Sequence, residues 1–248
     1  HIFERIQSIK NELCFDSIEI STNAVALDKT KAERLAALLS GINHEIWVSF
    51  HGVDKRTYEG IMGIDYERCL DNIVYLLKLS DVMPLKINIR GAGQGLLPEL
   101  RHGFEFTHEQ YTAFWEEQFK IHGIRTRPHI NFFRYHDRAG TIRRNNLRLC
   151  KIIRPDLSGF NCTRVGDYLH FLYTGELIIC CMDYHREEVF ADIGSQNIEA
   201  ILAGPYSALR DKVEGRIQTS DAFICKRCIY PEGTGKKINC ANSETHVK

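Results

Sequence analysis

Residues 162–184 read CTRVGDYLHFLYTGELIICCMDY, in which an alternating pattern of apolar and polar residues surrounds a turn at Tyr173–Gly175. Such alternation around a glycine-containing turn predicts a β-hairpin. A C-x-x-C pair, Cys225 and Cys228, follows the hairpin, and six of the nine cysteines lie between Cys150 and Cys228. Four thiolates held by a hairpin and a short loop are typical of a metal site, for which zinc and an iron–sulfur cluster are the two candidates.

The composition around this stretch is that of an ordinary globular protein. In 248 residues, 32 Lys and Arg balance 32 Asp and Glu, and 44% of the residues are apolar. A balanced charge argues against recruitment by nucleic acid or by an anionic membrane, and no run reaches the ~18 apolar residues of a membrane span. Because the cysteine count is odd and no secretory signal is recognisable, we expect reduced or metal-bound thiols in a cytoplasmic protein.

Upstream of the hairpin, helical and strand-like patterns alternate four times. Helices are expected over residues 1–14, 28–41, 65–79 and 108–123, and strands over residues 15–22, 44–52, 84–90 and 127–135. The short apolar strands are expected to be buried on both faces, which predicts parallel βα units.

Ligands of such sheets bind at the carboxyl ends of the strands. Small or polar residues stand at all four ends: Ser21, Thr22 and Asn23, then Ser49, Phe50 and His51, then Arg90–Gly93, then Phe133–His136. Other interpretations remain open for several of them. Thr22 and Asn23 would also suit a turn or a helix cap, and Ser49 could be a small residue tolerated in a strand. His51 and Arg90 could contact a carboxylate or lie on a solvated rim.

From about residue 137 the pattern changes. A polar connector carries Arg138, Arg143 and Arg144, which we expect on a solvated surface, and residues 188–194 add a third short strand to the hairpin. Residues 195–215 predict one or two helices with a break near Pro205. The expected domains are therefore residues 1–136 and 137–230, followed by a flexible tail at 231–248.

Several of these motifs resemble the radical S-adenosylmethionine (SAM) enzymes that carry a C-terminal SPASM or twitch-type auxiliary iron–sulfur domain. IEISTNA at 18–24 and IWVSFHG at 46–52 are similar to strands of the catalytic core. Twelve residues separate Cys162 from Gly175, and four separate Gly175 from Cys180, which resembles the cysteine–hairpin–cysteine signature of the family. The resemblance implies an α/β fold with a partial (βα)6 barrel, followed by a small α+β auxiliary-cluster domain.

The resemblance also implies the ligands. An auxiliary [4Fe–4S] cluster would be bound by Cys162, Cys180, Cys225 and Cys228. Cys180 is preferred to Cys181 for its distance from Gly175, and adjacent strand residues cannot both face one cluster. Iron–sulfur is preferred to zinc because a zinc ribbon would have two C-x-x-C knuckles where this sequence has one. Cys240 is left unassigned.

The resemblance also implies that residues at the strand ends of the core bind SAM or substrate. The resemblance implies that Ser49 hydrogen-bonds SAM and that Thr22 and Asn23 lie beside the pocket for SAM or substrate. The other cysteines of the core and connector, Cys14, Cys69 and Cys150, are interpreted as buried thiols.

The sequence departs from the family at one important place. The C-x-x-x-C-x-x-C loop that binds the catalytic cluster, and the Gly-Gly-Glu segment after the second strand, are both missing from these 248 residues. We expect an N-terminally incomplete protein that lacks the first βα units and the catalytic cysteines and is inactive alone. The alternative is a natural domain that has lost the radical cluster.

The resemblance implies that the intact enzyme holds a second [4Fe–4S] cluster and SAM. It would cleave SAM reductively to a 5′-deoxyadenosyl radical, which abstracts hydrogen from a peptide or small-molecule substrate. Electrons would come from a donor such as flavodoxin or ferredoxin, and neither nucleic acid nor a membrane is an expected partner. Two alternatives remain: an iron–sulfur accessory or electron-transfer module without radical chemistry, and a zinc-stapled interaction domain.

Overall fold

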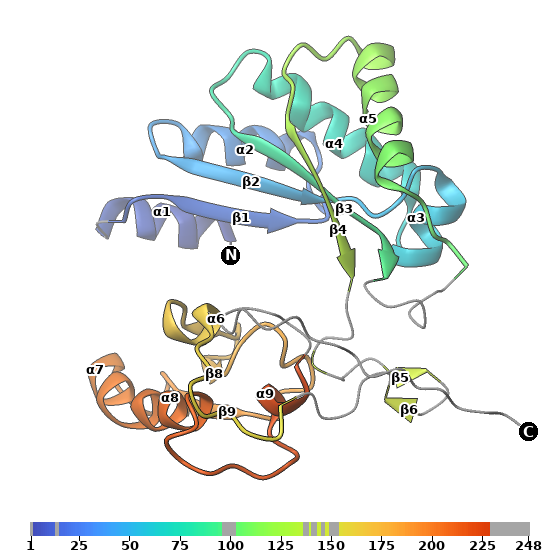
Figure 1. The fold of residues 1–248 in the computed structure, drawn as a ribbon. Coiled ribbons are helices and arrows are strands. Elements are labelled where there is room, and N and C mark those ends of the chain that lie inside the picture. The colour runs from blue at the N-terminus through green and yellow to red at the C-terminus, as the bar shows by residue number, and fades with distance from the viewer. Residues whose placement is uncertain are drawn as a thin grey trace, which may run out of the picture. The chain divides into compact units, whose positions relative to one another are not determined.

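The computed structural model describes residues 2–12, 15–95, 103–135, 139, 143–144, 147–148 and 154–228. The chain divides into two compact units, His1–Tyr135 and His136–Lys248, each of which is considered by itself (Figure 1). Predictions for Cys14, His136, Arg138, Cys150, Cys240 and the tail at 231–248 lie outside the described residues.

The first unit is built on a sheet of four strands in the order β1–β2–β3–β4, all parallel. The strands are β1 (Ile18–Thr22), β2 (His44–Ser49), β3 (Ile87–Gly95) and β4 (His129–Tyr135). The helices are α1 (Ile2–Glu12), α2 (Lys29–Leu39), α3 (Lys55–Met62), α4 (Tyr66–Ser80) and α5 (His108–His122). The predicted parallel sheet is therefore confirmed.

The helices begin where side chains satisfy their first backbone N–H groups. Asp28 caps α2 by accepting from the Lys31 N–H, and Asp65 caps α4 in the same way. Thr107 opens α5 with a reciprocal capping box. Such caps satisfy donors that an isolated helix end leaves unpaired, so local sequence was enough to place these starts.

Helix α3 was not predicted. It has only eight residues, too few for a clear apolar period. A capping box between Asp54 and Thr57 begins it, and Gly63 ends it in a left-handed conformation at φ +66°. Its Tyr58 is fully buried and stacks on Phe50 with ring centroids 4.1 Å apart. Tertiary packing of Tyr58 therefore stabilises a helix that is too short to be predicted from its own sequence pattern.

The expectation that the strands are buried on both faces was wrong. Burial alternates along β2, where His44, Ile46 and Val48 are buried and the residues between them are half-buried. Helices α2, α4 and α5 lie on one side of the sheet, as Figure 1 shows. Strand β1 begins at Ile18 rather than at residue 15, and its residues are half-buried or exposed. One face thus packs on helices, and the other carries the polar side chains.

The second unit contains a three-stranded antiparallel sheet in the order β7–β8–β9. Its strands are β7 (His170–Phe171), β8 (Glu176–Ile178) and β9 (Val189–Asp192). The turn between β7 and β8 contains Gly175 at φ +104°, a value that glycine adopts without strain. The predicted hairpin and its third strand are both present, with shorter strands than the alternation suggested.

Short helices surround this sheet: α6 (Thr163–Gly166), α7 (Ile198–Ile201), α8 (Ser207–Val213) and α9 (Ile224–Arg227). Between α7 and α8 the chain continues as a π-helical segment, η2 (Leu202–Tyr206), which contains Pro205. The break predicted at this proline takes the form of a π-helical segment between two α-helices. Proline lacks an N–H and clashes with a carbonyl of the preceding turn, and the wider π turn accommodates it. The connector also forms an unpredicted two-residue ladder, β5 (Arg143–Arg144) with β6 (Leu147–Arg148).

Candidate metal centre

Four cysteines that are far apart in the sequence line one cavity of the second unit. They are Cys162, Cys180, Cys225 and Cys228, the four named from the sequence. The rest of the lining is mostly apolar and consists of Ala139, Phe160, Arg164, Val165, Met182 and Ile224. Because the lining offers sulfur ligands and few other polar groups, the cavity suits a thiolate-bound metal centre.

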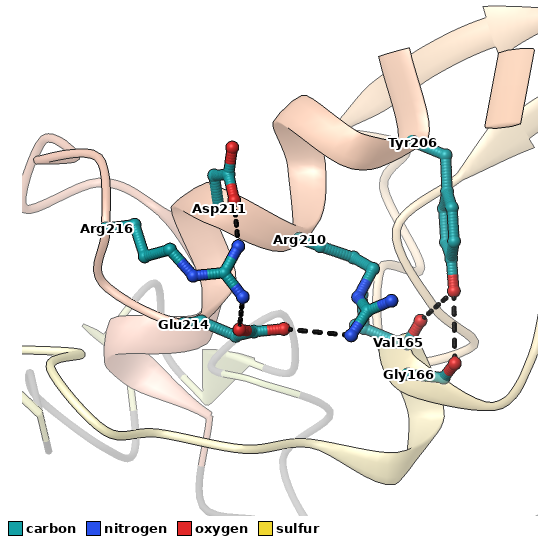
Figure 2. Close-up of polar contacts among 7 residues, drawn as sticks. All are labelled: Val165, Gly166, Tyr206, Arg210, Asp211, Glu214 and Arg216. Atoms are coloured by element: carbon teal, nitrogen blue, oxygen red, sulfur yellow. Dashed lines mark hydrogen bonds and ion pairs between the residues drawn. The ribbon is translucent and has the colours of Figure 1, made fainter. Parts of the chain in front are cut away.

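Cys162 stands at the start of α6, and its carbonyl accepts from the N–H groups of Val165 and Gly166. The same short helix is tied to the η2 segment. The Tyr206 hydroxyl donates to the carbonyl of Val165 at 2.6 Å and lies 3.2 Å from that of Gly166 (Figure 2). The backbone at Cys162 is thus held by local turns, and the short helix after it is held by Tyr206, a residue distant in the sequence.

Cys180 lies in a turn directly after β8. Its carbonyl accepts from the Asp183 N–H, and its sulfur accepts from the Met182 N–H. The Asp183 carboxylate is 2% exposed and accepts from the N–H groups of Glu187 and Glu188, both at 2.8 Å. The residues that follow the ligand are therefore anchored by a buried carboxylate.

Cys181 does not line the cavity. It is exposed, and its sulfur accepts from Nη1 of Arg164 at 3.0 Å. The geometry agrees with the choice of Cys180, but for a different reason from the one given above. Neither cysteine is in a strand, since β8 ends at Ile178, so the turn rather than strand alternation separates the two sulfurs.

Cys225 and Cys228 lie on and just after α9. The Arg154 N–H donates to the carbonyl of Lys226, and the Arg154 guanidinium donates to the carbonyl of Cys228. Sequence reasoning missed this arginine. No motif or spacing in the sequence around it singles it out.

The two residues between these cysteines were also missed. Lys226 is 6% exposed and donates to the Thr219 carbonyl, and Arg227 is 2% exposed and donates to the Ala139 carbonyl. Buried cations are uncommon unless they are paired, and each of these has a carboxylate partner, Asp221 and Glu187 respectively. Both cations therefore brace the C-x-x-C loop from within the unit.

Burial makes free thiolates unfavourable here. Desolvation, and to a smaller extent the neighbouring cysteines, raises the pKa of Cys180 to about 12. Desolvation likewise raises the pKa of Cys225 well above its ordinary value. A metal ligand must be deprotonated, so a bound cationic metal centre would supply the charge that this cavity needs.

The spacing of the sulfurs distinguishes the two candidate metals. A tetrahedral zinc site with Zn–S bonds of about 2.3 Å holds its sulfurs about 3.8 Å apart. Among the described residues, no three cysteine sulfurs lie within 4.8 Å of one another. A cluster places several metal and sulfide atoms between its thiolates and needs the wider spacing. The donor set therefore fits an iron–sulfur cluster better than a single zinc ion.

A second set of candidate residues lies in the first unit, on the sheet that α2, α4 and α5 cover from one side. Ser49 on β2 is opposite Arg90 on β3, which is opposite Asn131 on β4. Opposite residues share a face, so these three form a row at the carboxyl ends of the strands. Within the described part of the chain, none of the three side chains forms a hydrogen bond or an ion pair. Arg90 instead rests on the ring of Trp47, 4.2 Å from its centroid.

Thr22 and Asn23 have a local structural role. The Thr22 hydroxyl oxygen accepts from the Ala24 N–H at 3.0 Å, and the Asn23 amide oxygen accepts from the Val25 N–H at 3.2 Å. Ala24 itself is buried at a positive φ of 60°. These turn contacts leave the hydroxyl proton and the amide NH2 group of the two side chains as donors. His51 accepts from the Ala92 N–H through Nδ1, so it braces the bend at the end of β3.

The chain was compared with known proteins. Residues 162–229 match the family model of SPASM, an iron–sulfur cluster-binding domain. No curated protein matches the sequence. Among solved structures, Streptococcus suis SuiB bound to its precursor peptide SuiA matches with a TM-score of 0.51 and 12% identity, over 92% of this chain and 56% of that one. SuiB bound to S-adenosylmethionine matches with a TM-score of 0.49 and 12% identity, over 92% and 57%.

The second unit thus contains a SPASM domain, and the fold of the chain is shared with SuiB. The family match confirms the SPASM part of the resemblance, and the likeness to SuiB is one of fold. The chain spans a little over half the length of the SuiB chains that it matches. Among the described residues, no helix is both long and apolar enough to cross a membrane.

Proposed function

We propose that the chain belongs to a radical SAM/SPASM-type enzyme whose intact form cleaves SAM reductively and abstracts hydrogen from its substrate. Cys162, Cys180, Cys225 and Cys228 would hold an auxiliary [4Fe–4S] cluster, which would supply a centre for single-electron transfer. The observation that carries the proposal is the convergence of these four cysteines on one cavity within the SPASM match. The catalytic C-x-x-x-C-x-x-C triplet is not formed by any cysteines of this sequence.

The SAM site is proposed at the carboxyl ends of β1 to β4. Ser49, Arg90 and Asn131 offer a hydroxyl, a guanidinium and an amide in one row, and Thr22 and Asn23 add donors at the end of β1. The Arg90 guanidinium lies over the Trp47 ring, and a planar guanidinium suits a carboxylate. The methionyl carboxylate of SAM would accept hydrogen bonds from the side chains of this row.

A peptide is the substrate class that we favour over a small molecule, because SuiB, which shares the fold, was crystallised with a precursor peptide. We also propose that a flavodoxin or ferredoxin delivers the electrons. The proposed compartment is the cytoplasm, since unpaired cysteines and an iron–sulfur centre suit a reducing environment.

Anaerobic reconstitution with iron and sulfide tests the cluster. We expect uptake of about four iron atoms by the SPASM domain, with broad visible absorption that bleaches on reduction. The measurements are iron and sulfide counts and visible spectra. Binding of one zinc ion without visible absorption would instead support a zinc-stapled interaction domain. A cluster in a protein that never cleaves SAM would support an electron-transfer module.

Substitutions in the polar row test the SAM site. Arg90→Gln removes a charge-assisted hydrogen bond worth about 1.5–3 kcal/mol, so the Kd for SAM should rise about 10- to 100-fold. Ser49→Ala should raise it by less. Equilibrium dialysis of cluster-loaded protein with SAM measures both. Arg34→Gln is the matched control, since Arg34 pairs with Glu4 on the helical side of the sheet. Equal effects of Arg90→Gln and Arg34→Gln would rule out this site.

A further inference from the structure

Two arginines flank the cysteine cavity. Arg154 is 9% exposed, and its guanidinium lies 4.6 Å from the centroid of the Phe160 ring, which lines the cavity. The same guanidinium donates to the carbonyl of Cys228. Arg164 lines the cavity itself and donates to the sulfur of Cys181. Each arginine is therefore in contact with a residue that is, or adjoins, one of the four proposed ligands.

Lys226 and Arg227, the two buried cations within the C-x-x-C loop, lie beside carboxylates. Arg227 pairs with Glu187, and Lys226 lies 3.4 Å from Asp221. The other carboxylate close to the ligands, that of Asp183, accepts from two backbone N–H groups. Arg154 and Arg164 differ from Lys226 and Arg227 because their guanidinium groups are directed at the residues around the sulfurs.

A [4Fe–4S] cluster in this cavity would carry negative charge close to the guanidinium groups of Arg154 and Arg164. Four thiolates around a [4Fe–4S] core leave a net negative charge, and reduction adds one more. Most of the cavity wall is apolar, so charges within it are weakly screened. Nearby positive charge raises the reduction potential of such a cluster.

We propose that Arg154 and Arg164 are positioning residues that offset the negative charge of the auxiliary cluster and make it easier to reduce. The proposal rests on the proposed function, since it requires a cluster in this cavity. It assigns the two arginines an electrostatic role that a purely structural cluster would not need, and it makes the cluster a centre poised for electron transfer.

The test is an anaerobic redox titration of the reconstituted full-length protein, followed by visible absorption and electron paramagnetic resonance. Arg154→Gln and Arg164→Gln should each make the cluster about tenfold harder to reduce, a shift of about 59 mV for a one-electron couple. Arg154→Lys and Arg164→Lys keep the charge and should restore most of the potential. Iron counts and circular dichroism are measured for every variant.

Arg216→Gln is the matched control. Arg216 is in the same unit and pairs with Asp211 and Glu214 (Figure 2), and it is not among the residues that line the cavity. Its potential should equal that of the wild type.

Wild-type potentials in both Gln variants at wild-type iron content would overturn the proposal, as would an equal shift in Arg216→Gln. If Arg154→Gln does not fold, the reduction potentials of Arg164→Gln and Arg164→Lys alone test the proposal. A wild-type protein that takes up no iron would refute the proposed function together with this inference, whereas a loaded cluster with unchanged potentials would refute this inference alone.

Discussion

Replacing Cys180 by serine is expected to remove most of the iron from the SPASM domain, whereas the same change at Cys181 should leave the iron content at its wild-type level. The two cysteines are adjacent in sequence, but only Cys180 lines the cavity with the other three sulfurs. Cys181 is exposed and contacts Arg164. A serine hydroxyl is a much weaker ligand than a thiolate, so the cluster would lose one of its four attachments.

Loss of the cluster should also destabilise the second unit. Its core is small, and metal binding in such domains supplies folding free energy. We expect Cys180→Ser, Cys225→Ser and Cys228→Ser to lower the melting temperature of this unit and leave the first unit unchanged. Both tryptophans, Trp47 and Trp115, are in the first unit, so tryptophan fluorescence reports that unit while visible absorption reports the cluster. Full iron content in Cys180→Ser, or equal loss in Cys181→Ser, would contradict the assignment.

The second large effect is expected from Gly91→Ala in β3. A Cβ atom at this position would lie 2.4 Å from Cζ of Tyr111, inside any real contact distance. Tyr111 is fully buried, and its hydroxyl donates to the carbonyl of Phe50 at 2.8 Å at the end of β2. Overpacking of this kind costs about 1–3 kcal/mol of unfolding free energy. Because Gly91 follows Arg90, the polar row should be displaced as well and SAM affinity should fall.

Denaturant unfolding followed by tryptophan fluorescence measures the first effect, since the ring of Trp115 lies 6.4 Å from that of Tyr111. Gly204→Ala is the matched control, because no atom would lie within 4 Å of its added Cβ. It should leave stability and SAM binding close to wild type. An unchanged unfolding midpoint in Gly91→Ala would mean that Tyr111 can move aside, and the link from α5 to the strand ends would then be unnecessary for the fold.

Much of the fold could be predicted from local patterns. The helix starts at Asp28, Asp65 and Thr107 depend on capping residues within three positions of each helix. The hairpin depends on Gly175 and on alternation over a few residues on each side of it. The four cavity cysteines could be named because the spacing of the first pair and the C-x-x-C pair are themselves local signals. All of these features act over short stretches of chain, so a sequence read in order contains them.

Other features depended on contacts between distant segments. Which face of the sheet is covered was decided by helix packing, and the expectation of strands buried on both faces was wrong for that reason. Helix α3 is held by the stacking of Tyr58 on Phe50 and not by its own period. The π segment at Pro205 and the row of Ser49, Arg90 and Asn131 likewise required the assembled chain.

The cysteine–hairpin–cysteine stretch shows the division most clearly. By itself the sequence determined that four thiols were available and that iron–sulfur was preferred over zinc. The tertiary structure decided that Cys180 faces the cavity from a turn while Cys181 faces away from it. It also brought Arg154 to the carbonyl of Cys228, seventy-four positions further along the chain. Charge and burial act through space, so no local pattern could have revealed which cations would lie beside the sulfurs.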